Sequence, residues 1–325
     1  MTDLFSLLKN TGAYRAVKSD KSGNKLSHAY LILTADGDNL KEYLKIFATL
    51  MLCEESDPCG YCRACSLVQN DAHPDVLVFP KKEGAVLAED VSELIEESYL
   101  RPIESDKKIF IINHAESMNA SAQNKLLKTL EEPPRGVHII LGATSEYTLL
   151  PTVKSRVKKL EIPAFSVEQL TYALKDDCPD QDKLATAIAC GDGTVGKAKS
   201  LYGDESLQEI TLLALDTLTN MASSKDVLLY SNKIAKVDFN EFLSVLELLL
   251  RDIMVLLQDR ENLVTNKKYL SELKRIEKFN NGSVLHALES VTEARKRKKF
   301  NMNATMLTEW LLFQILEGKY KWQKL

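Results

Sequence analysis

The chain has 325 residues, of which 45% are hydrophobic and 27% are charged, and its formal net charge at pH 7 is −4. This composition is typical of a globular protein, and it excludes wholesale disorder, a collagen-like structure and a membrane-embedded chain. A slightly acidic chain does not hold nucleic acid through its overall charge, so any such contact has to be local. The length predicts two or three domains.

No export signal is evident at the amino terminus, because polar residues interrupt the leucines of segment 1–17. The most apolar stretch, 242–257, carries Glu247, Arg251 and Asp252, so it does not qualify as a membrane span. We therefore expect a cytoplasmic protein.

Short apolar segments alternate with helical patterns over residues 1–163. Strands are expected at 28–34, 75–80, 108–113, 137–142 and 159–162. Helices are expected at 40–52, 91–99 and 120–131. This alternation predicts a parallel sheet that is covered by helices, which together form an α/β domain.

The strand signals stop after Pro163. Residues 164–203 predict a small helical lid, and residues 204–325 predict a helical C-terminal domain. Segment 304–316 is apolar around most of the helix circumference, which indicates burial inside this domain or against a partner. We expect an α/β domain followed by two all-α parts.

Four of the six cysteines lie close together in the sequence: Cys53, Cys59, Cys62 and Cys65. Their spacing, Cys-x5-Cys-x2-Cys-x2-Cys, indicates metal ligation, because four thiolates suit tetrahedral zinc. No open coordination position is implied, so the site is expected to be structural. An iron–sulfur cluster and unligated thiols remain as alternatives, although the downstream cysteine followed by proline of a ferredoxin run is missing.

Three segments resemble AAA+ clamp-loader subunits: Lys125–Pro134 (Lys-Leu-Leu-Lys-Thr-Leu-Glu-Glu-Pro-Pro), Leu26–Leu31 and the pair Ser155-Arg156. The resemblance implies a RecA-like AAA+ domain with an inserted zinc module at about 53–65, then a lid and a C-terminal collar. It also implies a hetero-oligomeric ring. The expected partners are ATPase subunits of the tau/gamma type and a delta-type subunit, and indirectly a sliding clamp and primed DNA.

The phosphate loop of that family is degenerate in this chain. A working loop reads G-x-x-x-x-G-K-[ST], in which backbone amides cradle phosphates and the lysine reaches the terminal ones. Segment Thr34–Lys41 (Thr-Ala-Asp-Gly-Asp-Asn-Leu-Lys) retains Gly37, but Leu40 occupies the lysine position and Lys41 comes one residue late. Its two aspartates, Asp36 and Asp38, place negative charge where phosphate oxygens would lie and would repel them.

Two further nucleotide contacts of the family are also absent. Asn113 and His114 stand where an ATPase has the carboxylates that hold magnesium, and Gly196 stands at the second sensor arginine. Thr144 falls at the first sensor, where we expect a structural hydroxyl. The chain is therefore expected neither to bind nor to hydrolyse ATP.

The resemblance implies that Arg156 survives as a catalytic group for a neighbouring subunit. In the family this arginine projects into the neighbour's ATP site, where a guanidinium neutralises charge that develops in the transition state. The alternative is an ordinary surface arginine at the end of a loop. Val157 replaces the cysteine that usually follows in the motif.

Two other functions remain open at this point. The chain could be an active ATPase that uses Lys41, or a zinc-dependent DNA-binding module. The basic run 295–299 could contact a phosphate backbone, but such a run is more often a solvated helix face.

Overall fold

The computed structural model describes residues 2–82, 84–276, 279–299 and 302–321. The chain divides into two compact units, one comprising Met1–Gln169 with Thr194–Gly196 and the other comprising Leu170–Gly193 with Lys197–Leu325. The expected division into three parts at 163 and 203 remains a prediction.

The first unit is built on a parallel sheet of five strands in the order β2-β3-β4-β1-β5. The strands are β1 (Ala29–Thr34), β2 (Val76–Phe79), β3 (Lys108–Ile112), β4 (Val137–Ala143) and β5 (Lys158–Ile162). All five expected strands are present, and β3 is buried along its whole length. The apolar runs become central strands because they can be covered on both faces.

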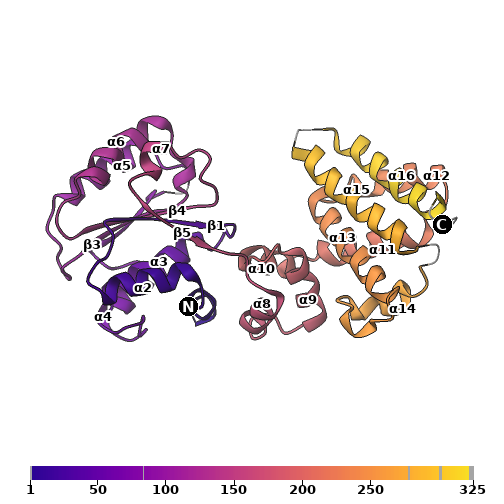
Figure 1. Ribbon diagram of the computed structural model, residues 1–325, viewed down its shortest axis with the longest axis horizontal. Coiled ribbons are helices and arrows are strands. Elements are labelled where there is room, and N and C mark those ends of the chain that lie inside the picture. Colours follow the sequence, from indigo (N-terminus) through magenta and orange to yellow (C-terminus); the bar gives the residue numbers. More distant parts are fainter. Residues whose placement is uncertain (1, 83, 277–278, 300–301, 322–325) are drawn as a thin grey trace. The chain divides into compact units, whose positions relative to one another are not determined.

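Helices cover both faces of this sheet (Figure 1). They are α1 (Thr2–Lys9), α2 (Gly12–Ser22), α3 (Leu40–Leu52), α4 (Arg63–Gln69), α5 (Ala88–Ser98), α6 (Ala120–Glu131) and α7 (Pro151–Lys154), with a 3₁₀ turn η1 (Ala115–Ser117). Helices α2 and α3 lie on one face, and α5, α6 and α7 lie on the other. The fold class of this unit is therefore α/β, with a parallel sheet covered by helices on both faces, as expected.

Gly142 brings α3 unusually close to β4. A Cβ atom at this position would lie 2.5 Å from Leu44 Cδ1 and 2.9 Å from Leu40 Cδ1. The absence of a side chain on the strand thus creates the space that the first turns of α3 fill.

The second unit is helical. Two of its helices, α8 (Val167–Leu174) and α10 (Val195–Gly203), begin with residues of the first unit. The others are α9 (Gln181–Cys190), α11 (Ser206–Asn220), α12 (Ser224–Ile234), α13 (Phe239–Leu256), η2 (Glu261–Leu263), η3 (Lys267–Tyr269), α14 (Leu270–Leu273), α15 (Asn281–Lys299) and α16 (Ala304–Lys321). Helix α13 runs through its core and contacts α9, α11 and α15. None of the helices in the described residues is long and apolar enough to span a membrane.

Helix α16 is only partly buried within this unit. Leu307, Leu311 and Ile315 are buried, whereas Met306 and Phe313 are 67% and 39% exposed. The apolar residues of 304–316 therefore divide between the core and the surface of the unit.

Candidate functional site

Leu40, at the position of the phosphate-loop lysine, is fully buried. It begins α3, and its Cδ1 atom packs over Gly142 of β4. Thr34, the last residue of β1, is also buried, and its hydroxyl accepts the amide of Asp36 at 3.2 Å. The side chain that would reach a phosphate in a working loop is here an apolar part of the core.

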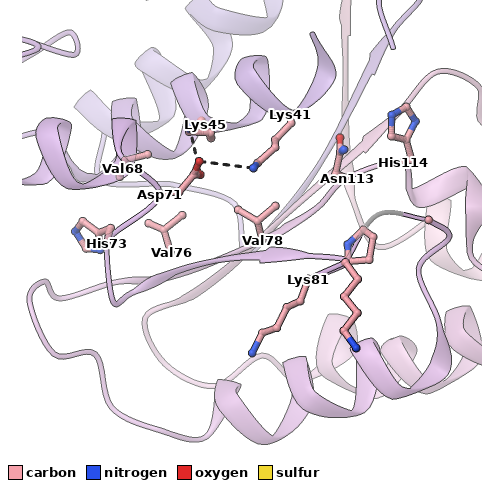
Figure 2. A pocket seen from close by; sticks show the side chains of 13 residues that line it. Lys41, Lys45, Val68, Asp71, His73, Val76, Val78, Lys81, Asn113 and His114 are labelled. Atoms are coloured by element: carbon pink, nitrogen blue, oxygen red, sulfur yellow. Dashed lines mark ion pairs between the residues drawn. The ribbon is translucent and has the colours of Figure 1, made fainter. Parts of the chain in front are cut away.

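Lys41 lies on the side of α3 that faces the end of α4. Its Nζ atom is 3.7 Å from Asp71 Oδ2, and Nζ of Lys45 is 3.2 Å from Asp71 Oδ1 (Figure 2). These groups line an open cavity of about 740 Å³, which also reaches Asn113 and His114. Lys41 stands one residue after the position of the phosphate-loop lysine. Because successive helical residues point in different directions, its side chain is directed towards Asp71 instead.

Asp36 is buried and satisfied by four neighbours within the first unit. Its carboxylate accepts hydrogen bonds from Tyr43 Oη at 2.9 Å, Asn39 Nδ2 at 3.2 Å, and the amides of Val195 at 3.0 Å and Gly196 at 3.2 Å. Burial and then the Asp36 charge raise the pKa of the Tyr43 hydroxyl, so this hydroxyl remains a donor. A carboxylate thus already occupies the amides that could bind an external anion.

Asp38 and Gly196 are also in close contact. A Cβ atom on Gly196 would lie 2.6 Å from Asp38 Cβ and 2.7 Å from Asp36 Oδ1. Space for the larger side chain of a sensor arginine is therefore missing at Gly196.

The residues at the ends of β3 and β4 converge on Glu116. His114 adopts a left-handed conformation with φ 55°, and its Nδ1 lies 3.0 Å from Glu116 Oε1. Thr144 donates to the same oxygen from its hydroxyl at 2.7 Å and from its amide at 3.2 Å. Burial acts to raise the pKa of the Glu116 carboxyl. Hydrogen bonds with His114 and Thr144 outweigh this effect and hold that pKa below its ordinary value.

Gly37 lies against this cluster. A Cβ atom there would be 3.1 Å from Thr144 Cγ2 and 3.5 Å from His114 Cε1. Asn113 lies nearby in sequence, and its Oδ1 atom is buried and has no hydrogen-bond partner within the described residues. Thr144 thus bonds to Glu116 of its own chain, a partner that sequence reasoning did not identify, and the structural role expected for its hydroxyl stays a prediction.

Arg156 follows α7 at the surface of the first unit. Helix α7 is anchored by Val153, which is fully buried. The Arg156 side chain is 33% exposed; its Nη1 donates to the Thr152 carbonyl at 2.7 Å, and its Nη2 lies 2.5 Å from Glu131 Oε1. The sequence indicated the arginine but not its carboxylate partner on α6.

The four clustered cysteines come together in space. Their sulfur atoms all lie within 4.8 Å of one another, and the Sγ–Sγ distances Cys53–Cys62 and Cys59–Cys65 are 3.9 and 3.8 Å. Four sulfurs at about 2.3 Å from one tetrahedral zinc would be about 3.8 Å apart, so the donor set fits this ion. Burial acts to raise the Cys59 thiol pKa, but the amides of Tyr61 and Cys62 outweigh it and lower this pKa to about 7.

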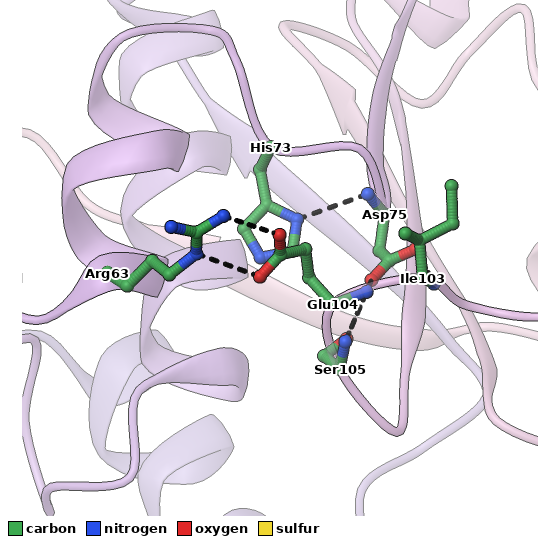
Figure 3. A network of polar contacts seen from close by, with 6 residues as sticks. All are labelled: Arg63, His73, Asp75, Ile103, Glu104 and Ser105. Carbon is green, nitrogen blue, oxygen red and sulfur yellow. Dashed lines mark hydrogen bonds and ion pairs between the residues drawn. The ribbon is translucent and has the colours of Figure 1, made fainter.

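A polar network, exposed at Arg63 and buried at Asp75, connects the cysteine module to the sheet (Figure 3). Arg63, the first residue of α4, makes two hydrogen bonds to Glu104 at 2.9 and 2.7 Å. Asp75, which is 0% exposed, accepts the amides of Ile103 at 2.6 Å, Glu104 at 2.8 Å and Ser105 at 2.9 Å. Asp75 therefore fixes the loop that leads into β3.

The basic run 295–299 is partly engaged inside the helical unit. Arg295 Nη2 is 2.9 Å from Glu247 Oε2, and the Arg297 guanidinium lies 4.2 Å from the centre of the Trp310 ring. The side chain of Lys299 lies outside the described residues. Two of the five basic side chains therefore have partners on neighbouring helices.

The chain is similar in sequence to known subunits of DNA polymerase III. Residues 9–166 match the family model described as "DNA polymerase III, delta subunit". The chain is 26% identical over 318 residues to DNA polymerase III subunit delta' of Bacillus subtilis, covering 94% of both chains. It is 30% identical over 188 residues to the Escherichia coli subunit delta', covering 56% of each. A DNA polymerase III gamma subunit-related protein of Thermotoga maritima aligns with a TM-score of 0.43 and 20% identity, covering 93% of this chain and 99% of that one.

Proposed function

We propose that the chain is a non-hydrolysing subunit of a DNA polymerase III clamp-loader complex, since it belongs to the delta-prime family of clamp-loader subunits. It would supply Arg156 in trans to the ATP site of a neighbouring ATPase subunit. In this way it would help to load a sliding clamp on primed DNA.

The absence of ATP hydrolysis is supported by three local features. Leu40 is packed into the core where a lysine would have to contact phosphate. Asp36 presents a buried carboxylate to the loop, which would repel a polyanion at close range. Asn113 and His114 offer no carboxylate for magnesium at the end of β3.

The single observation that carries the catalytic part is the position of Arg156. A short helix anchored by the buried Val153 presents it at the surface of the first unit, so that it is available to another subunit. A guanidinium aimed at a γ-phosphate stabilises the charge of the transition state without moving a proton. In related phosphoryl transfers such a group contributes about 10³–10⁵ in rate.

Zinc would be held by Cys53, Cys59, Cys62 and Cys65. Bound there, it would act as a structural cross-link with no open position for catalysis. Cys53 caps the end of α3 and Cys62 caps the start of α4, so the metal would fasten these two helices together.

The partners follow from the proposed family function. We expect ATPase subunits of the tau/gamma type, a delta-type subunit and, indirectly, the sliding clamp and primer–template DNA, all in the cytoplasm. The alternative ATPase that uses Lys41 is less favoured because Lys41 is paired with Asp71. The alternative zinc-dependent DNA-binding module is less favoured because the net charge is −4.

The test is Arg156→Ala in the reconstituted complex, with ATP turnover as the readout. We expect turnover to fall by about three orders of magnitude or more at the affected site. Arg135→Ala, which removes another exposed arginine of the same unit, is the matched control and should leave turnover unchanged. If turnover with Arg156→Ala stays within about a factor of two, the role of this arginine in rate enhancement is wrong.

A further inference from the structure

The guanidinium of Arg156 is held by its own chain. Its Nη2 atom pairs with Glu131 at 2.5 Å, and its Nη1 atom donates to the Thr152 carbonyl at 2.7 Å and to Ser155 Oγ at 3.3 Å. A guanidinium whose charge is neutralised by a neighbouring carboxylate attracts a phosphate less strongly than a free one. These contacts therefore have to be exchanged before the arginine can act on another subunit.

Helix α6 contacts both ends of segment 148–156, which carries this arginine. Near its start, Gln123 is buried, and its Oε1 atom accepts the amide of Leu150 at 2.7 Å while its Nε2 atom donates to the Thr148 carbonyl at 3.0 Å. At its end, Glu131 binds the guanidinium. The Gln123 side chain is buried, whereas the ion pair between Glu131 and Arg156 is partly exposed, so water and salt can compete with it.

Glu131 also lies at an unfavourable place for a carboxylate. It is the last residue of α6, where the carbonyl ends of the helix carry partial negative charge. A cation nearby offsets this repulsion, and Arg156 supplies it in the free subunit.

We propose that Glu131 is a positioning residue that retains Arg156 in the free subunit and yields it to the terminal phosphate of a nucleoside triphosphate held by a neighbouring subunit. The exchange replaces one anion by another, so the guanidinium is never left unpaired. Both side chains are partly exposed, at 33% and 47%, and a pair of this kind shifts an equilibrium by only about two- to five-fold. This proposal rests on the function proposed above.

The test is Glu131→Gln in the reconstituted complex, with ATP turnover measured over a range of ATP concentrations. The variant keeps the shape of the side chain but removes the competing charge. We expect the KM for ATP to fall about two- to five-fold with kcat unchanged, because ground state and transition state gain equally from a freed arginine. The gain should shrink as salt is raised, since salt screens exposed ion pairs.

Matched variants separate this role from a structural one. Glu132→Gln removes the neighbouring exposed carboxylate, which makes no ion pair in the described part of the chain, and should leave KM unchanged. Glu131→Asp restores the charge and should return KM towards that of the parent complex. Glu131→Gln combined with Arg156→Ala should match Arg156→Ala alone, because the carboxylate acts only through the arginine.

An unchanged KM, or a lower kcat, in the Glu131→Gln complex would overturn this role for Glu131. The proposed role of Arg156 itself would stand in that case if Arg156→Ala still lowers turnover by about three orders of magnitude. Persistent turnover with Arg156→Ala would instead refute the proposed function, and with it this inference.

Discussion

Asp75 is expected to be a principal stabilising residue of the first unit. Its carboxylate is 0% exposed and accepts three backbone amides from Ile103, Glu104 and Ser105 at 2.6–2.9 Å. Oδ1 accepts the amide of Ile103, and Oδ2 accepts the amides of Glu104 and Ser105. Asn has only one acceptor oxygen, so Asp75→Asn must place an NH₂ group against at least one of these amides.

The size of the effect follows from this count. A hydrogen bond to a charged group contributes about 1.5–3 kcal/mol net, so losing one of them in Asp75→Asn should lower the free energy of unfolding by about 2–3 kcal/mol. Asp75→Ala loses all three acceptor contacts, and a loss of about 3–5 kcal/mol is expected.

Hydrogen exchange measured by mass spectrometry on peptides that contain β2 and β3 is the suitable assay. A loss of 2 kcal/mol should make the slowest amides of these strands exchange about 30-fold faster. Tryptophan fluorescence serves as an internal control, because both tryptophans, Trp310 and Trp322, follow the last strand of the sheet by more than 140 positions in the sequence. The free energy of unfolding that the fluorescence reports should change less than the one derived from the exchange rates of the strands.

Asp106→Asn provides the matched variant. Asp106 lies beside the same loop, but its side chain is 82% exposed, and its ion-pair partner in the described part of the chain is its neighbour Lys107. We expect a change below about 0.5 kcal/mol for this exposed pair. Equal exchange rates in Asp75→Ala and Asp106→Asn would refute the reasoning that the buried amide contacts stabilise the sheet.

Two further predictions concern the loop and the metal. Leu40→Lys should not restore ATP binding in equilibrium dialysis. It should lower the free energy of unfolding by more than about 2 kcal/mol, because it places an ammonium group in the core. Micromolar ATP binding by this variant would show that one substitution is enough to restore the phosphate loop. Elemental analysis should find one zinc per chain and no iron, and a chain without zinc or iron would contradict the four-thiolate site. Cys62→Ser or a strong chelator should speed hydrogen exchange around residues 53–70. The metal affinity should fall at low pH, because the thiolates become protonated.

The regular elements could be predicted because their signals are local. The buried strands read as continuous apolar runs, and α3 and α6 show helical spacing. The cysteine cluster was predictable for the same reason, since its spacing brings all four sulfurs within reach of one ion.

The polar partners could not be predicted, because each joins residues that are distant in the sequence. Nothing near Asp75 indicates that it would accept amides from Ile103 and its neighbours, and nothing near Arg156 indicates Glu131. Such pairs depend on how helices and strands pack, which a single sequence does not reveal. Short elements such as α4 and α7 were missed as well, because one or two turns show no clear periodicity.

Helix α3 joins two regions that differ entirely in chemistry. It begins at Leu40 and ends at Leu52, next to Cys53, and its 13 residues form a rod about 20 Å long. Oxidation of the sulfurs by peroxide, or their capture by mercury, would remove the thiolates that could hold one ion between the end of α3 and the start of α4. Redox damage to the cysteines would then leave α3 fixed by its packing, including that against β4 at the end that begins with Leu40.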